Sequence, residues 1–380
     1  MQGWPVVVGI PVRNEAERIR ECVLALDHQI GAPPPELVLF LNDTSDGSAR
    51  IVQDLMPSLR MSVHVVEGRL PAEQQAAGFA RCRAMDLAAK RAGPGGILLS
   101  TDADGRVVLN WLERNLAHLQ SGVDAVAGRA VIDAVEAAAI PQRLHDDDAA
   151  ECAYAAALDE VDHWIDPKLY DPWPRHTEHS GASICVRYEA FHRAGGIPAV
   201  SAGEDRAFFA ALDGADARIR HAPDVSVTVS GRLVGRAAGG MADTIRRRIA
   251  RPDPFLDDRL EPACDALQRT VWKRQLRQAI ERGDGAVVSR LCARWGVSPP
   301  PGLSSFGPMW ARLEGMASAL QRRAVPAARV MVELAEVRAI LEWLRAMQAE
   351  ERLEGAVEYL EQGRRQAETG RVVIDQPAIL

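Results

Sequence analysis

The first 110 residues alternate short β-branched segments with longer amphipathic ones, and this alternation limits the fold more than any other feature. A strand and helix repeat of this kind buries its apolar faces as a mostly parallel sheet covered by helices. We therefore expect an α/β fold with a nucleotide-binding type of first half. The expected strands are 5–10, 36–41, 62–67 and 96–101, and the expected helices lie within 14–29 and 45–55.

The middle of the chain, from 111 to about 250, is less regular. We assign its elements to the same domain, as extra strands and loops added to the first sheet. An acidic run, Asp146 to Asp148, precedes an Ala-rich segment and is interpreted as the solvated first turn of a helix, where negative charge is favourable. The expected strands are 124–132, 182–186 and 224–230, and the expected helices are 149–164 and one that begins near 204.

The strand pattern vanishes after about residue 250. Apolar residues then recur at helical spacing, which predicts a helical unit of 251–380 behind an α/β domain of 1–250. Its apolar stripes also permit a homodimer. The segment 298–302 is interpreted as a loop within it. The two clearest stripes are Trp272, Leu276 and Ile280, and Leu334, Val337, Leu341 and Leu344.

Composition excludes several classes of partner. The net charge of −7 leaves no global basic field for nucleic acid, and attraction to an anionic membrane is not expected. No segment approaches the ~20 apolar residues that span a bilayer. The six cysteines are scattered without ligand-like spacing, which indicates reduced thiols and a cytoplasmic protein.

Two aspartates, Asp102 and Asp104, directly follow the fourth expected strand. Ligand sites of open α/β sheets lie beyond the carboxyl ends of their strands. Two carboxylates on alternate residues repel each other unless a cation or a donor-rich partner neutralises them, and Mg²⁺ and Mn²⁺ prefer such oxygen ligands. The alternative is that Asp104 caps a helix that follows it.

Four motifs occur in order along the chain: VVVGIPVRNEAERI, LFLNDTSDGSARIV, STDADG and GEDRAFFAAL. Together they resemble the family 2 glycosyltransferases of the GT-A fold, which use nucleotide sugars. The resemblance runs over roughly residues 5 to 240. It implies a Rossmann-like, mostly parallel sheet flanked by helices, followed here by an all-helical C-terminal extension.

The resemblance also implies catalytic roles. Asp104 would bind a divalent cation, Mn²⁺ or Mg²⁺, that bridges the donor diphosphate, and Asp102 would contact the donor ribose or the metal. Asp205 would be the base that deprotonates the acceptor hydroxyl, with Glu204 beside it, and family members generally invert the anomeric centre. From the residues alone, without the other motifs, a capped helix start is the better interpretation of Glu204 and Asp205.

The donor side departs from the family at two positions. Asn42 stands where the family usually has an acid, and Arg13 stands where it often has a tyrosine, so a uridine donor is plausible without being assured. Arg81 also fits an exposed helix charge, and Arg232 and Arg236 also fit a surface hinge. The full expected donor set is Pro11, Arg13, Glu15, Asn42, Asp43, Gly78, Arg81, Asp102, Arg232 and Arg236.

The segment 173–198 resembles the family's acceptor region. His179, Ser180 and Gly181 are expected to contribute to the acceptor pocket, and Trp164 and Trp173 either stack on a sugar or pack in the core. His221 is interpreted as a lone structural histidine before a strand.

Three functions remain in competition. The leading hypothesis is a metal-dependent transferase that moves a sugar from a nucleoside-diphosphate donor to a hydroxyl of a small or peripheral acceptor. The second is a catalytically silent nucleotide-binding or assembly protein that acts through its helical tail. The third is a nucleotidyltransferase, although the glycine-rich phosphate loop of that class is missing after the first strand.

Overall fold

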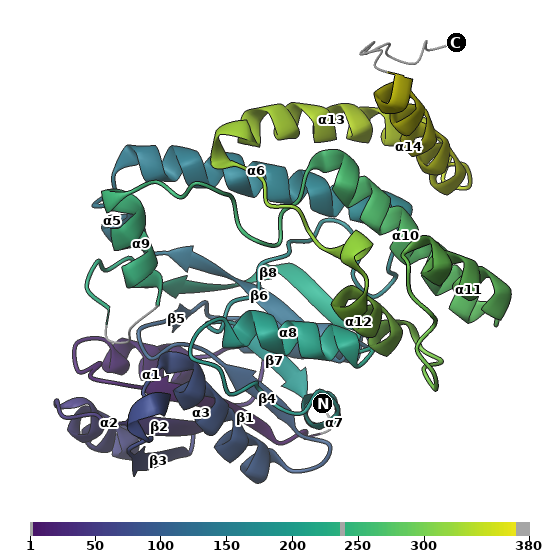
Figure 1. Cartoon of the computed structure of the whole chain (residues 1–380). Helices are drawn as coiled ribbons and strands as arrows, with labels where there is room; N and C mark the ends of the chain where they lie inside the picture. The colour runs from purple at the N-terminus through teal and green to yellow at the C-terminus, as the bar shows by residue number, and fades with distance from the viewer. Residues whose placement is uncertain (1–2, 236–239, 370–380) are drawn as a thin grey trace. The chain divides into compact units, whose positions relative to one another are not determined.

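The computed structural model describes residues 3–235 and 240–369, and it separates into two compact units (Figure 1). A sheet unit consists of Met1–Asp147 and Leu169–Pro252, and a helical unit consists of Asp148–Lys168 and Asp253–Leu380. The domain boundary expected near residue 250 stays a prediction. The grouping of Asp148–Lys168 with the C-terminal helices was not anticipated from the sequence.

An eight-stranded mixed sheet forms the centre of the sheet unit, in the order β3-β2-β1-β4-β7-β6-β8-β5. β1 pairs in parallel with β2 and β4, β2 with β3, and β6 with β8. β7 runs antiparallel to β4 and β6, and β5 runs antiparallel to β8. The expected α/β architecture is confirmed. The strands are β1 (Val6–Val12), β2 (Glu36–Asn42), β3 (Val63–Gly68), β4 (Ile97–Ser100), β5 (Arg106–Val107), β6 (Ala125–Ile132), β7 (Ile184–Arg187) and β8 (Ile219–Val229).

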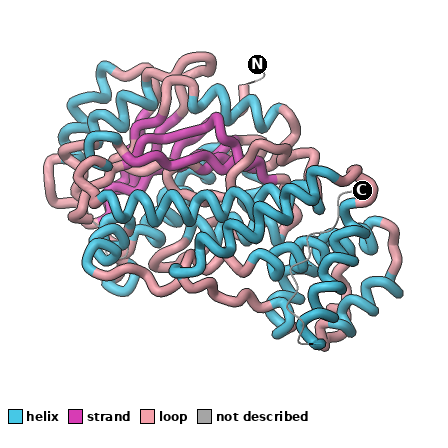
Figure 2. The backbone as a smooth tube through the Cα atoms, turned by 90° about the horizontal axis from the view of Figure 1, so that it is seen from above, coloured by secondary structure: helices cyan, strands magenta, loops and turns pink. Residues whose placement is uncertain are grey.

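Helices cover both faces of this sheet, as Figure 2 shows. Successive residues of a strand point to opposite faces. Val8 and Ile10 of β1 therefore join the core under α1, α2 and α4, whereas Val7 joins the core under α3, α7 and α8. The helices are α1 (Ile19–Asp27), α2 (Ser48–Leu55), α3 (Ala77–Ala92), α4 (Trp111–Gln120), α5 (Ala134–Ala137), α7 (Tyr188–Arg193), α8 (Glu204–Gly214) and α9 (Met241–Ala250), with short 3₁₀ helices η1 (Met56–Ser58) and η2 (Ala72–Gln74).

Gly9 allows α3 to lie directly on β1. A Cβ atom at this position would lie 2.8 Å from the carbonyl oxygen of Ala84 and 3.1 Å from the Cβ of Ala88. We predict that Gly9→Ala lowers the free energy of unfolding by about 1–3 kcal/mol, the usual effect of overpacking. Denaturant unfolding of the full chain measures it. Gly3→Ala is the control, since no atom lies within 4 Å of the corresponding Cβ, and an equal loss in both variants would contradict the packing argument.

α6 (Gln142–Ile165) begins earlier than the sequence indicated. It starts directly after Pro141, a residue that is common at helix starts. Asp146 to Asp148 therefore lie beyond the first turn, and the prediction that they form that turn is wrong. Two of them have partners within the helix: Asp146 accepts a hydrogen bond from Gln142, and Asp147 pairs with Arg143 at 3.4 Å.

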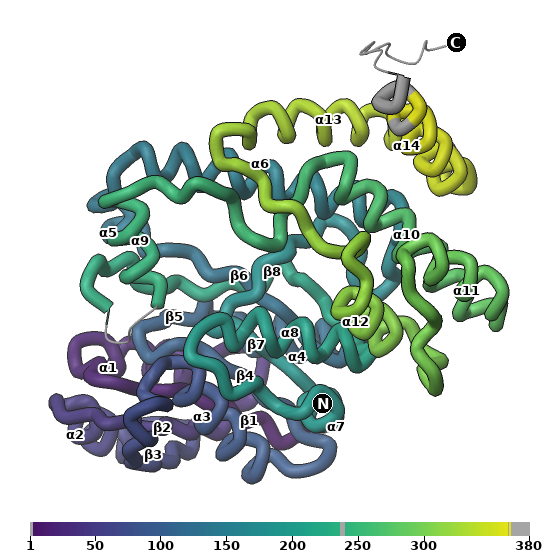
Figure 3. Tube along the Cα trace, viewed as in Figure 1, coloured from purple at the N-terminus to yellow at the C-terminus, as the bar shows by residue number. Residues whose placement is uncertain are grey.

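The helical unit contains two apolar clusters around α10, and its chain path can be followed in Figure 3. The stripe of Leu334, Val337, Leu341 and Leu344 is buried in the first cluster. Leu276 is buried in the second, with Trp272 and Ile280 partly buried against it, so both predicted stripes are confirmed. Besides the rest of α6, the elements are α10 (Ala263–Glu281), α11 (Gly285–Arg294), α12 (Phe306–Met316), α13 (Val330–Ala346), α14 (Arg352–Thr369), η3 (Ser318–Leu320) and η4 (Ala327–Arg329).

Two further sequence expectations concern the whole chain. Among the described helices, none combines the length and the apolar composition needed to cross a membrane. All six cysteines are free thiols, as predicted.

Candidate active site

Three carboxylates gather where β1 and β4 end side by side. Glu15 follows β1, and Asp102 and Asp104 follow β4, its parallel neighbour. The carboxyl ends of parallel strands form the ligand crevice of such sheets. Asp104 is not a helix cap, because the next helix, α4, begins only at Trp111 and has Asn110 at its N-cap. The capping alternative for Asp104 is therefore excluded.

Arg232 joins two of these carboxylates. Its guanidinium donates to both carboxylate oxygens of Glu15, with Nη1 at 2.7 Å from Oε2, and its Nη2 lies 3.2 Å from Oδ2 of Asp104. Arg232 follows Glu15 by 217 positions in the chain. The predicted donor residues Glu15 and Arg232 are thus brought together beside Asp104, whereas Arg236 lies outside the described residues.

Arg81 is buried at the centre of the site, with 5% of its surface exposed. Its Nη1 donates to Ser100 Oγ at 2.9 Å and to the carbonyl oxygen of Gly181 at 2.8 Å. Its Nε donates to Glu204 Oε1 at 2.9 Å, and its Nη2 donates to Asp102. The alternative of an exposed helix charge is therefore wrong for Arg81.

The charges around Arg81 keep it cationic. Burial alone lowers the pKa of the guanidinium, but the carboxylates of Asp102 and Glu204 outweigh burial and raise it. A buried charge of this kind is tolerated only when it is paired and hydrogen-bonded. Arg81 therefore acts as a fixed cation that holds Asp102, Gly181 and Glu204 in one arrangement.

The surroundings of Asp104 raise the pKa of its carboxyl. Burial raises the pKa of its carboxyl to about 6, and Asp102 and Glu15 add to the rise while Arg232 opposes it. A carboxyl with a raised pKa binds a proton in the folded chain at pH values where the unfolded chain has lost it. The free energy of unfolding therefore falls as the pH rises from about 4 to about 6 and Asp104 loses its proton. Above pH 6, the ionised carboxyl lowers the free energy of unfolding by about 3 kcal/mol.

We predict that Asp104→Asn is more stable than the wild type near pH 7, by up to this amount, and that the difference shrinks near pH 4.5. Denaturant unfolding at both pH values, with EDTA present, measures it. Asp54→Asn removes an exposed acid of α2 and should show no such gain. A variant of Asp104 that is less stable than the wild type near pH 7 would mean that its contact with Arg232 outweighs the repulsion.

Glu204 and Asp205 form the first turn of α8, and their side chains have different partners. Glu204 is 7% exposed and bound to Arg81. Asp205 is partly exposed; its Oδ2 accepts from the Gly181 N–H at 2.9 Å and its Oδ1 from the Arg206 N–H at 2.8 Å. The two acids do begin a helix, as the alternative held, but they also bind the predicted acceptor segment and the Arg81 network.

Polar residues gather at the end of β2, the strand next to β1. Asn42 is buried, and its Oδ1 accepts from the backbone N–H of Leu70 at 3.1 Å. Asp43 has a φ of +51° and lies 3.8 Å from Arg13 and 3.3 Å from Arg69. Arg13, one of the two residues that depart from the family on the donor side, thus lies beside Asp43, which directly follows the other, Asn42.

Two other predicted donor residues have contacts within the protein. A Cβ on Gly78 would lie 2.2 Å from the carbonyl oxygen of Val200, so Gly78 allows close approach between α3 and the segment before α8. Pro11 lies opposite Phe40 of β2, beyond the last residue of β1 that pairs with β4. Direct contacts of Gly78 and Pro11 with a donor stay predictions.

The predicted acceptor residues lie in the loop between α6 and β7. Gly181 is held on both sides, because its N–H donates to Asp205 and its carbonyl accepts from Arg81, and a Cβ there would lie 2.5 Å from the Arg81 Cζ. Ser180 Oγ accepts from the Ala182 N–H at 3.2 Å. Trp173 is half-buried in the same loop.

Trp164 lies elsewhere, in the helical unit. The guanidinium of Arg352 lies 4.1 Å above its ring, and the ring packs against the apolar cluster of that unit. Its surroundings are therefore those of a packing residue, which was the alternative to sugar stacking.

The sequence interpretation missed the surroundings of His221. This residue lies inside β8, which begins at Ile219, and it is not isolated. Its Nδ1 is 2.9 Å from Asp171 Oδ2, and its Nε2 is 3.0 Å from Nε2 of His179. The partners are 50 and 42 positions away, so no local sequence signal identifies them.

The carboxylates after β4 fit a divalent cation as part of a ligand set. Within residues 3–235 and 240–369, no group of three or more His, Cys, Asp or Glu side chains is arranged to hold a metal alone. Mg²⁺-type ions are commonly held by one or two carboxylates together with substrate phosphates. The oxygen atoms of Asp102 and Asp104 suit this shared mode of binding.

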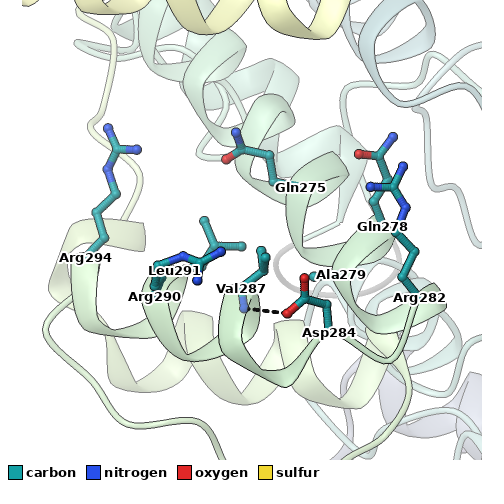
Figure 4. Close-up of a pocket in the computed structure, with 9 residues that line it drawn as sticks. All are labelled: Gln275, Gln278, Ala279, Arg282, Asp284, Val287, Arg290, Leu291 and Arg294. Atoms are coloured by element: carbon teal, nitrogen blue, oxygen red, sulfur yellow. Dashed lines mark hydrogen bonds between the residues drawn. The ribbon is translucent and has the colours of Figure 1, made fainter.

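A separate pocket of about 300 Å³ lies in the helical unit (Figure 4). It is lined by polar side chains of α10 and α11, among them Gln275, Gln278 and three arginines. Asp284 at its edge accepts from the Val287 N–H at 3.0 Å and so caps α11. None of the residues predicted from the sequence lies in this pocket.

The match to a known family lies in the part of the chain that contains the first three sequence motifs. Residues 7–182 match the model of the family described as Glycosyl transferase family 2. A search of curated protein sequences gave no match.

Several solved structures are distantly similar to the chain. A mannosyltransferase, PcManGT, from Pyrobaculum calidifontis in complex with GDP-Man and Mn²⁺ is 17% identical over 96% of this chain and 80% of its own, with a TM-score of 0.43. TarS 1–349 of S. aureus in complex with UDP-GlcNAc is 17% identical over 95% of this chain and 92% of its own, with a TM-score of 0.45. Glucosyl-3-phosphoglycerate synthase from Mycobacterium tuberculosis is 13% identical over 66% and 78%, with a TM-score of 0.36.

Proposed function

We propose that the chain, whose residues 7–182 match the model of glycosyl transferase family 2, is a glycosyltransferase that moves a sugar from a nucleoside-diphosphate donor to a hydroxyl acceptor in a cation-dependent, inverting reaction. Asp205 is the proposed general base. The proposal also gives each charged group of the candidate site a distinct task.

The donor diphosphate is proposed to bind at the ends of β1 and β4. Asp104, with Asp102, would hold Mn²⁺ or Mg²⁺ together with the diphosphate oxygens. Such an ion supplies Lewis acidity, which takes up the negative charge that develops on the departing nucleoside diphosphate. Arg232 adds a second cation beside Asp104 that suits phosphate oxygens. Arg13 and Asn42 are proposed to face the nucleobase.

The acceptor is proposed to bind beside Asp205 and the segment His179–Gly181. Asp205 takes the hydroxyl proton while the acceptor oxygen forms its bond to the anomeric carbon. The bond from that carbon to the diphosphate oxygen breaks at the same time, so one displacement inverts the centre. Glu204 is committed to Arg81, and the role of base therefore falls to Asp205.

One observation carries the proposal. Arg81 bonds directly to Asp102 on the donor side and to the Gly181 carbonyl on the acceptor side. The same Gly181 donates its N–H to Asp205. A transfer reaction needs donor and acceptor groups held together in a fixed geometry, and this chain of contacts supplies such a link.

Titration calorimetry and donor hydrolysis test the proposal. UDP-glucose, UDP-GlcNAc and GDP-mannose are each tested with Mn²⁺ and with EDTA. We expect at least one donor to bind and to be hydrolysed only with the cation, and Asp104→Ala to abolish both. Asp54→Asn is the matched control, an exposed acid of α2. Absence of binding by every donor, with no effect of Asp104→Ala, would contradict the proposal.

We also propose that the acceptor is a small or peripheral molecule in the cytoplasm. The chain is further proposed to form a homodimer through its C-terminal helices. Size measurement of the full chain across a concentration series tests the dimer.

A further inference from the structure

A hydrogen-bonded array links the acceptor loop to β8. It consists of Asp171, His221 and His179, in that order. Asp171 is 2% exposed, and its Oδ1 also accepts from the His221 backbone N–H at 2.9 Å and from Arg220 at 3.1 Å. Its Oδ2 lies 3.4 Å from Arg175. The inner end of the array is therefore fixed by bonds to both main chain and side chains.

The array determines which ring nitrogens carry protons. Asp171 is an ionised acceptor, because the hydrogen bond from His221 and the charge of Arg175 outweigh burial and lower the pKa of its carboxyl. His221 therefore donates from Nδ1. The two Nε2 atoms, 3.0 Å apart, share one proton, so neutral His221 accepts there and His179 donates. This arrangement fixes neutral His179 as the Nε2–H tautomer, with its lone pair on Nδ1.

His176 lies against the array without joining it. Its Nδ1 accepts from the Glu178 N–H at 3.1 Å and its Nε2 lies 3.3 Å from the carbonyl oxygen of Ala222. Burial, reinforced by His221, lowers its pKa to about 3, so it stays neutral. The charged and titratable groups that surround the two histidines are Asp171, Arg175, His176 and Glu178 of the loop, Arg129 of β6, Asp205 and Arg206 of α8, and Arg220 of β8.

The outer end of the array lies beside the proposed base. The His179 ring stacks on Phe209, with ring centroids 4.5 Å apart and planes 14° from parallel. Phe209 follows Asp205 by one turn of α8, so the two share a helix face. Gly181, two residues after His179, donates its N–H to Asp205. His179 is thus linked to the surroundings of Asp205 through Phe209 on the same helix and through Gly181 on the same loop.

We propose that Asp171 and His221 are positioning residues that hold His179 in one tautomer and orientation for the acceptor hydroxyl beside Asp205. This inference rests on the proposed function, in which Asp205 receives the hydroxyl proton. The role resembles that of the buried carboxylate in other active sites, which orients a histidine without touching the substrate.

The first experiment examines the array without any substrate. Long-range ¹H–¹⁵N correlation spectra of the ¹⁵N-histidine-labelled full chain are recorded from pH 5 to 8, with peaks assigned from His179→Gln and His221→Asn. We expect one tautomer for each ring and uptake of a single proton shared by the pair. In His221→Asn, the asparagine amide still reaches Asp171, and His179 should titrate as a single, uncoupled ring. Independent titration of both rings in the wild type would overturn the array.

The second experiment measures catalysis, with water as the acceptor and each of the three donors named above. We expect His221→Asn to lower kcat by about 10- to 100-fold, a loss usual when the partner that orients an active-site histidine is removed, with the donor KM unchanged. His221→Gln places an amide near the Nε2 position and should restore part of the rate. His118→Asn is the control, since His118 of α4 also pairs with an aspartate. Its Nε2 lies 2.9 Å from Oδ1 of Asp224, which is on β8 like His221.

The outcomes separate the two proposals. If the wild type binds and hydrolyses no donor, the proposed function fails, whereas the spectra still decide whether the array exists. If donors are hydrolysed and His221→Asn matches the wild type in kcat, the positioning role is overturned. A fall in kcat that His118→Asn reproduces, or that accompanies loss of the folded state in thermal unfolding, also overturns it.

Discussion

Replacing Asp205 with asparagine is expected to lower the rate of sugar transfer by about 10²- to 10⁴-fold, the usual contribution of a placed general base. Asparagine keeps an oxygen that accepts the Gly181 N–H but has no basic carboxylate. Donor binding should survive, because Asp205 is not among the groups proposed to hold the diphosphate. Initial rates of donor hydrolysis and calorimetric donor affinity are the two measurements.

The control for this variant is Asp213→Asn, an exposed acid near the other end of α8. Asp213→Asn removes one negative charge from α8, as Asp205→Asn does, and should leave the rate unchanged. A rate for Asp205→Asn within about threefold of the wild type would exclude general-base catalysis by this residue, since even the weakest typical contribution is far larger. A loss of rate in Glu204→Gln would not identify Glu204 as the base instead, because Glu204 is bound to Arg81.

Replacing Arg81 with methionine is expected to have the largest effect on stability. The variant leaves the buried Glu204 carboxylate and Asp102 without their cation. Removing one partner of a buried ion pair typically costs about 3–5 kcal/mol. Denaturant unfolding of the full chain measures the loss, and donor hydrolysis should fall with it, because the link between Asp102 and Gly181 is broken.

Arg91→Met is the matched control, since Arg91 lies on the same helix and pairs with Glu36 at the protein surface. A surface pair of this kind contributes about 0–1 kcal/mol. Equal losses in the two variants would mean that helix content, rather than the buried network, is affected. Arg81→Met combined with Glu204→Gln should recover part of the stability, because the second change removes the unpaired charge.

The strands of the first half were predictable because each is a short apolar run between helical segments. β1, β2 and β3 lie within two residues of their predicted bounds. The position of Asp102 and Asp104 beyond the end of a buried strand was also predictable, since two acids on alternate residues directly follow an apolar run. The sequence did not predict that Asp104 caps no helix. That outcome depends on β5, a strand of only two residues that separates Asp104 from the next helix.

Arg81 and His221 show what a sequence does not reveal. The pattern around Arg81 is that of any helix with a charged residue, and its burial depends on four partners from three other parts of the chain. His221 has no informative neighbour in the sequence, and its meaning comes from Asp171 and His179. In both cases the deciding interactions are long-range and polar, whereas sequence periodicity reports local and apolar ones.

The long separations within the Arg81 network also determine when the site is completed during synthesis. Glu204 follows Arg81 by 123 positions, and Arg232 follows Glu15 by 217. A nascent chain that ends at residue 182 contains the whole family match but lacks Glu204, Asp205 and Arg232. Because domains form from the N-terminus onward as the ribosome releases them, strands β1 to β4 emerge well before the charges that neutralise their polar ends. A fragment cut at that boundary would therefore contain Glu15 and Asp104 without Arg232, and Arg81 without Glu204, so the charge pairs of the candidate site are completed only by the last part of the sheet unit to be translated.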